Sequence, residues 1–121
     1  MKSPFHLSCI DACNECALAC NICASACLKE ADAKMMANCI TFDLDCAAIC
    51  ALTAAVVARG SDNVKAVCQL CADICDACGD ECASHDMDHC RQCADSCRRC
   101  AEECRRVSPQ MAERRELAAH A

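Results

Sequence analysis

Apolar positions recur every three or four residues along most of the chain, and cysteine fills many positions that a helical core normally gives to leucine or valine. The string C-x2-C-x3-C-x2-C-x3-C occurs three times, over residues 13–27, 68–82 and 90–104. At 100° per residue, each of these blocks falls within an arc of about 80° on a helix surface. A β-strand would place the same residues on both of its faces. The pattern therefore predicts helices that each carry one stripe of thiols.

The breaks between the stripes predict four helices, over residues 4–30, 33–59, 63–83 and 87–107. Short connections make consecutive helices antiparallel neighbours. We therefore expect an all-α fold, an antiparallel up-down-up-down four-helix bundle with a Cys-lined core. Residues 1–107 would form this bundle domain, and residues 108–121 a C-terminal tail or short helix.

The expected helix boundaries carry residues that suit helix ends. Ser3 can cap the first helix, and Asp32 can cap the second. Gly60 is expected to end the second helix, and Ser61 or Asp62 to start the third. Each of these positions supports the division into four helices.

Composition narrows the class of protein. Of the 121 residues 19 are cysteine, while only two are glycine and two are proline, too few turn residues for a disulfide-stapled miniprotein. Trp and Tyr are absent, and the net charge is −6, so the chain lacks aromatic stacking platforms and would be repelled by phosphate backbones. We expect no nucleic-acid partner.

The sequence also gives an expectation of location. No stretch of 18 uninterrupted apolar residues occurs, so we expect no membrane span and no membrane partner. The first residues lack the apolar run of a signal peptide. We therefore expect a cytoplasmic protein, in a compartment where thiols are kept reduced.

The thiols are the candidate metal ligands. They are Cys9, Cys13, Cys16, Cys20, Cys23, Cys27, Cys39, Cys46, Cys50, Cys68, Cys71, Cys75, Cys78, Cys82, Cys90, Cys93, Cys97, Cys100 and Cys104. Neutral thiols can also act simply as small apolar core residues, which is how the metal-free bundle would fold. A thiol-disulfide redox protein is an alternative, but it needs one Cys pair in a βαβ context, and an iron–sulfur protein normally uses loop cysteines. No general base, activated nucleophile or cofactor motif is visible, so we expect no enzymatic activity.

Thiolate ligands restrict the metal to soft ions, chiefly Cu(I) or Zn(II). Zinc takes four ligands, and four thiolates leave its site doubly negative, which is unfavourable for many sites in a dry interior. Cu(I) carries one charge, so about one ion per thiolate would leave a long buried array neutral. The sequence therefore favours multiple Cu(I) ions per chain, with a zinc-thiolate buffer as the alternative.

The repeated Cys string, the sparser second helix and the segment His85–His89 before Cys90 resemble the cytosolic copper storage proteins of bacteria, over Cys9 to Cys104. The resemblance implies a Cu(I)-filled four-helix bundle with thiol ligands throughout. It also implies a role in holding or sequestering cytosolic copper, with exchange to a copper chaperone or chelator, and a homotetramer. The segment from Ser108 onward has no counterpart in this pattern.

The two ends of the predicted bundle differ in chemistry. Met35, His85 and His89 lie near the end that also carries Cys27, where thioether and imidazole groups suit Cu(I), so we expect the metal entrance here. The three are candidate ligands, and the alternative is that the histidines are ordinary surface residues and Met35 fills a gap in the packing. Asp43 falls on the second helix's thiol stripe, either as a weak ligand or as a hydrogen-bonded structural carboxylate.

Hydrocarbon side chains occupy the opposite end. Phe5, Thr53, Val57, Val64 and Val107 fall on or near the extrapolated stripes there, so we expect this end to be plugged.

A second apolar stripe lies on the first helix, away from its thiols. It consists of Leu7, Leu18 and Ile22. A lone bundle would expose this stripe to solvent, so we expect a homo-oligomer.

Overall fold

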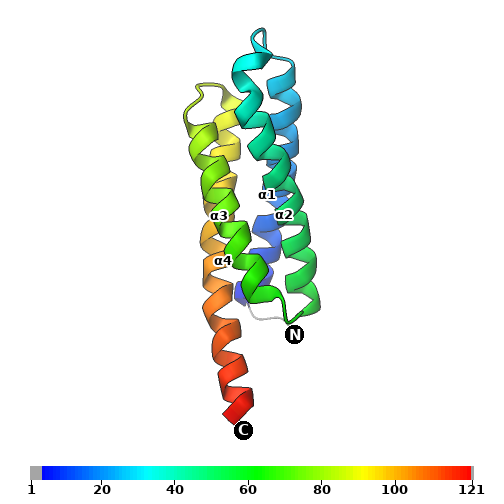
Figure 1. Ribbon diagram of the computed structural model, residues 1–121, viewed down its shortest axis with the longest axis vertical. Coiled ribbons are helices and arrows are strands. Elements are labelled where there is room, and N and C mark those ends of the chain that lie inside the picture. The colour runs from blue at the N-terminus through cyan, green and yellow to red at the C-terminus, as the bar shows by residue number, and fades with distance from the viewer. Residues whose placement is uncertain (1–3, 121) are drawn as a thin grey trace.

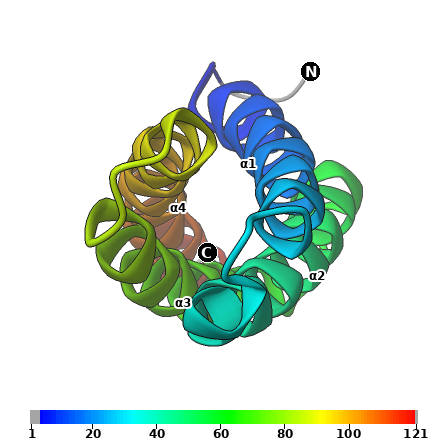
Figure 2. The ribbon, with the colours of Figure 1, turned by 90° about the horizontal axis from the view of Figure 1, so that it is seen from above.

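The computed structural model describes the backbone of residues 4–120 and the side chains of residues 6–107. In chain order its elements are α1 (Pro4–Leu28), the short 3₁₀ helix η1 (Ala33–Met36), α2 (Ala37–Arg59), α3 (Val64–Ala83) and α4 (Asp88–His120). Successive α-helices run in opposite directions (Figure 1). Seen along the bundle, each helix packs against two neighbours around a common axis (Figure 2). The predicted all-α four-helix bundle is confirmed.

The turn between α2 and α3 forms as the sequence predicts. Gly60 follows the last residue of α2 in the left-handed region, with φ of 64°. This conformation lets the amide of Gly60 donate to the Val57 carbonyl at 3.1 Å and the amide of Ser61 donate to the Val56 carbonyl at 3.2 Å. Glycine adopts it without the steric penalty that a Cβ would bring, so the helix ends here and the chain reverses.

Two other predicted helix starts are wrong in detail. Asp32 makes no side-chain capping bond, and residues 33–36 form η1, so α2 begins at Ala37. The tighter 3₁₀ turn buries Met36 against the core. At α3, Ser61 Oγ accepts a bond from the Asn63 amide at 3.1 Å, one residue before the helix. The predicted cap at Ser3 lies outside the described residues.

The last helix is longer than expected. The predicted end at residue 107 is wrong, because the backbone continues as one helix through Ser108 and Pro109 to His120. This part of α4 projects beyond the other three helices (Figure 1). A proline removes only one backbone donor, and the following residues are rich in Ala, Glu and Arg, which favour helix.

Small residues let α3 and α4 approach closely. A Cβ built on Gly79 would lie 3.3 Å from Cys97 Cβ, which is tighter than most real Cβ contacts, and 3.7 Å from the Ala94 carbonyl oxygen, an ordinary contact. Glycine in a helix interior costs about 1 kcal/mol relative to alanine. At Gly79 this cost is offset by the close packing of the two helices that it allows.

Among the described residues, one helix is long and apolar enough to cross a membrane by length and composition, the segment Ala33–Arg59. Half of the most apolar part of this segment is buried inside the bundle. A core helix of a bundle passes the same test, because its inner face must be apolar to pack against its neighbours.

Candidate metal centre

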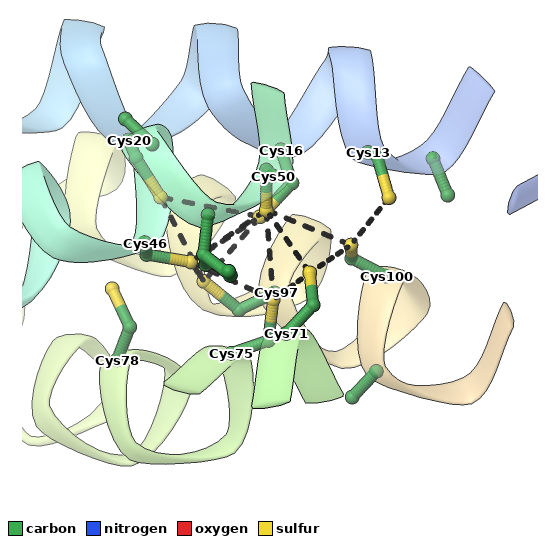
Figure 3. Packing of buried hydrophobic residues seen from close by; sticks show 14 of the residues in the cluster. Cys13, Cys16, Cys20, Cys46, Cys50, Cys71, Cys75, Cys78, Cys97 and Cys100 are labelled. Atoms are coloured by element: carbon green, nitrogen blue, oxygen red, sulfur yellow. Dashed lines mark hydrogen bonds between the residues drawn. The ribbon is translucent and has the colours of Figure 1, made fainter. Parts of the chain in front are cut away.

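Every thiol of the chain faces the interior of the bundle. All 19 cysteines are unpaired, and each is 0% exposed. Their steps of three and four residues give each helix one thiol stripe, and the four stripes converge on the bundle axis (Figure 3). The predicted Cys-lined core is confirmed, and it runs from Cys9 and Cys68 near one end to Cys27 and Cys90 near the other.

Sulfur atoms from all four helices lie close to one another in the core. Helix-to-helix Sγ–Sγ distances are 3.6 Å for Cys20–Cys93, for Cys39–Cys82 and for Cys46–Cys75. Within one helix, sulfurs four residues apart lie 3.8 to 3.9 Å from each other. A disulfide needs an S–S distance of about 2.05 Å, so these thiols are close neighbours without being bonded.

The core contains many groups of sulfurs that could share one metal ion. In each of at least five groups, four sulfurs all lie within 4.8 Å of one another. These groups are Cys13/71/100/104, Cys16/46/50/75, Cys16/20/46/97, Cys20/78/93/97 and Cys23/27/39/90. Two thiolates on one ion, each about 2.3 Å from it, lie at most about 4.6 Å apart. The second and third groups share Cys16 and Cys46, and the third and fourth share Cys20 and Cys97, so these sulfurs can bridge neighbouring ions.

Burial keeps the metal-free thiols neutral. Burial is the main cause that raises the pKa of Cys90 to about 11, and it also raises the pKa of Cys27 above its ordinary value. Among the described buried residues, none is Lys or Arg, so no fixed cation offsets thiolate charge inside the bundle. A thiol therefore loses its proton favourably only when a metal cation takes the place of that proton.

Asp43 is the single carboxyl group inside the described core. Its side chain is 0% exposed, and Oδ1 accepts hydrogen bonds from the thiols of Cys78, Cys82 and Cys93 at 3.3, 3.5 and 3.3 Å. Oδ2 accepts from the Cys39 thiol at 3.8 Å. Burial raises the pKa of Asp43 to about 10, so the metal-free protein holds it as a neutral acid at neutral pH. The structure therefore shows Asp43 as a hydrogen-bonded carboxyl that is also within reach of metal at those thiols.

His89 brings an imidazole to the mouth of the core. Its Nδ1 lies 3.5 Å from Cys23 Sγ, 3.6 Å from Cys90 Sγ and 3.9 Å from Cys27 Sγ. On the other side of the ring, Nε2 lies 2.9 Å from Glu30 Oε1. The structure thus brings His89 together with one group of four sulfurs, as the sequence predicts for a rim ligand.

The other predicted rim residues are arranged differently. His85 Nε2 pairs with Glu81 Oε2 at 3.0 Å, one turn back on α3. Met35 is 72% exposed, so the structure does not place it among the thiols. Its neighbour Met36 is buried against the core, and Met87 packs on the core from the rim.

Glu30 was not apparent from the sequence as a site residue. It lies in the turn after α1 and meets His89 from a position 59 residues away. Only the folded arrangement of the α1 and α4 ends brings the two together, so no local spacing in the sequence marks the pair.

The opposite end of the core is closed by hydrocarbon. Val57, Val64 and Val107 are each 0% exposed, and Thr53 is buried with its hydroxyl donating to the Ile49 carbonyl at 2.7 Å. The predicted plug is present at these four positions. The side chain of Phe5, which was also predicted to belong to it, lies outside the described residues.

An array of buried thiols, grouped closely enough for several sulfurs to bind one metal ion, inside a four-helix bundle, defines a thiolate-based metal-binding protein. Residues 3–109 match the model of the family Csp, described as copper storage protein. The chain belongs to the copper storage protein family, as the resemblance in its sequence indicated.

Solved structures of similar proteins include metal-bound and metal-free forms. The Cu(I)-bound copper storage protein BsCsp3 is 46% identical, with a TM-score of 0.82 over 86% of this chain and 98% of that one. Apo-Csp3 from Bacillus subtilis is 46% identical, with a TM-score of 0.77 over 84% of this chain and 96% of that one. A cytosolic copper storage protein from Streptomyces lividans, with five coppers, is 45% identical, with a TM-score of 0.83 over 87% of this chain and 92% of that one.

A curated relative is the uncharacterized cysteine-rich protein YhjQ of Bacillus subtilis strain 168. It is 48% identical over 66 residues, which make up 54% of this chain and 61% of that protein. The chain thus matches less than two thirds of the length of this relative.

Replacing Asp43 by Asn should flatten the pH dependence of stability in the reduced, metal-free protein. Below the ordinary pKa of 3.8, the Asp43 carboxyl is protonated in both the folded and the unfolded protein. Between pH 3.8 and the folded-state pKa of about 10, only the unfolded chain loses this proton. The free energy of unfolding should therefore fall as pH rises, by up to about 1.4 kcal/mol per pH unit from this one group.

Denaturant unfolding of the wild type and Asp43→Asn between about pH 5 and about pH 7.5, below the ordinary thiol pKa, measures this slope. As the pH rises, the unfolding free energy of Asp43→Asn should increase relative to that of the wild type. Parallel curves would mean that Asp43 is ionised in the folded protein.

Proposed function

We propose that this protein is a non-enzymatic store of cytosolic copper that binds many Cu(I) ions through the thiolates of its core. The observation that carries this proposal is the array of 19 fully buried thiols, many of which lie 3.6 to 4.0 Å from a neighbouring sulfur. Its copper-loaded relatives, one with ten copper equivalents, support the same metal and a high capacity.

Charge favours Cu(I) over zinc as the cargo. One Cu(I) per thiolate replaces one proton with one cation, so the buried array stays neutral at every stage of loading. Zinc with four unshared thiolates would leave each site doubly negative in an interior where the described side chains offer no Lys or Arg. A zinc-thiolate buffer would therefore be opposed by charge as its sites accumulate.

The geometry gives less support to a thiol-disulfide redox function. Redox-active cysteines are partly exposed and sit beside a group that stabilises the thiolate. Here every thiol is 0% exposed, and burial raises the pKa of Cys27 and Cys90 at the mouth. Storage uses buried thiols directly, whereas disulfide exchange needs them to reach a partner's sulfur.

We place the protein in the cytoplasm, where reduced thiols persist and where a copper chaperone or a small chelator would deliver and remove Cu(I). The structurally similar protein from Streptomyces lividans is a cytosolic copper storage protein, which supports this location.

A homotetramer completes the proposal. The apolar stripe on α1 is exposed as predicted, with Leu7 at 54%, Leu18 at 62% and Ile22 at 54%. Burying such a stripe against another copy removes it from water. Sedimentation of the reduced protein at the 12.9 kDa monomer mass would contradict this assembly.

Copper should enter at the end that carries His89. There an imidazole nitrogen lies beside Cys23, Cys27 and Cys90, whereas the other end is closed by Val57 and Val64. An ion bound at the mouth can pass inward by ligand exchange, because Cys39 Sγ lies 3.6 Å from Cys82 Sγ, and Asp43 Oδ1 lies 3.5 Å from Cys82 Sγ and 3.3 Å from Cys93 Sγ. The rim would then control the rate of copper uptake, and the interior thiols the number of ions bound.

Anaerobic titration of the reduced protein with Cu(I), in competition with a chromophoric chelator, tests the storage function. We expect uptake of many equivalents, approaching or exceeding the 19 thiols, with no displacement by excess zinc. The control is a protein alkylated at its thiols while unfolded, which should bind almost none. Saturation at one or two ions would contradict the proposal.

Replacing His89 by Ala should slow the first phase of Cu(I) uptake from a bulky chelator about tenfold, while the final number of bound ions changes little. His85→Ala is the matched control. His85 is also a rim imidazole paired with a glutamate, but its partner Glu81 lies only four residues away, so the bond does not cross the mouth. Stopped-flow absorbance measures the phase. Unchanged kinetics in His89→Ala together with faster uptake in Val64→Ala would place the entrance at the opposite end.

A further inference from the structure

The two histidines at the mouth form similar carboxylate pairs with different consequences. His85, in the loop after α3, pairs with Glu81, which lies four residues earlier in the last turn of that helix. His89 pairs with Glu30, which comes from the turn between α1 and η1, so this bond spans the mouth of the thiol core. The second pair alone has thiols on the far side of its imidazole.

The hydrogen bonds of His89 distinguish its two ring nitrogens. An ionised glutamate can only accept, so Nε2 carries the proton that it donates to Glu30 Oε1 at 2.9 Å. In the neutral ring, Nδ1 then holds a lone pair, and this atom faces Cys23 and Cys90 at 3.5 and 3.6 Å. Glu30 therefore selects both the tautomer of the ring and the direction in which its free nitrogen points.

We propose that Glu30 is a positioning residue for copper entry: it holds the His89 ring across the mouth so that Nδ1, and not Nε2, meets each incoming Cu(I) beside Cys23, Cys27 and Cys90. This inference rests on the proposed storage function, and it adds a residue that contacts none of the thiols by itself. Carboxylates that hold a metal-binding imidazole in this way strengthen binding or activity about 10- to 100-fold.

Burial supports a defined orientation of this pair. The side chains of His89 and Glu30 are 18% and 36% exposed, so the ring is largely held by its surroundings while the carboxylate still reaches water. Without Glu30, water would compete for Nε2 and the ring would lose its only described bond to the α1–η1 turn. Nδ1 would then face the sulfurs for a smaller fraction of the time.

The first test uses the copper-free, reduced protein and needs no metal. Long-range ¹H–¹⁵N NMR should show His89 with a protonated, slowly exchanging Nε2 and a lone-pair Nδ1, together with contacts between the ring and the Cys27 Hβ protons. Glu30→Ala should lose the slow exchange and those contacts. Glu81→Ala should leave the His89 signals as they are, because it removes the equivalent partner of His85.

The second test is a double-mutant cycle on the first phase of Cu(I) uptake from a bulky chelator. Glu30→Ala should slow this phase about tenfold, and Glu30→Gln should keep most of the rate because its amide oxygen can still accept from Nε2. In a His89→Ala background, Glu30→Ala should have no further effect. Circular dichroism of each variant checks that the bundle is intact.

Other outcomes overturn the assignment. Equal slowing by Glu30→Ala and Glu30→Gln that persists in the His89→Ala background would mean that Glu30 attracts copper by its charge alone. A His89 ring with unchanged NMR signals in Glu30→Ala would mean that other contacts orient it. Failure of the storage function itself is separate, since it would appear as a low copper capacity in the wild type.

Discussion

The need to keep a dry, thiol-lined interior electrically neutral governs this structure. All 19 thiols are fully buried, and the described buried side chains include no Lys or Arg that could balance a thiolate. Without metal, each sulfur must keep its proton, and the thiols pack as small apolar groups. With metal, a singly charged cation for each lost proton preserves neutrality, which suits Cu(I) better than a divalent ion.

The same constraint explains the carboxyl group and the two unlike ends. Asp43 is tolerated in the core because burial raises its pKa to about 10, which keeps it neutral and available to accept bonds from the surrounding thiols. The carboxylate of Glu30 lies instead at the rim, where water still reaches it. Valines close the other end, where Val57, Val64 and Val107 are each 0% exposed.

The cysteine spacing was sufficient to predict the bundle, because steps of three and four fix which face of each helix is buried. The stripes located the thiols, Asp43 and the valine plug without any knowledge of the turns. Details that depend on the turns were not predictable: η1 turns Met36 inward and Met35 outward, and the Glu30–His89 pair joins segments 59 residues apart. The continuation of α4 past Pro109 could not be predicted, because a proline inside a helix removes a backbone donor and usually kinks or ends it.

Counting the protons released as Cu(I) loads is the most direct test of this account. Reduced protein in weak buffer near neutral pH would be titrated anaerobically with Cu(I), and released protons followed with a pH indicator alongside bound copper. Neutral loading predicts about one proton per Cu(I) until the thiols are consumed. Release of about two protons per ion throughout, as expected for a core that accumulates anionic thiolate sites, would contradict it.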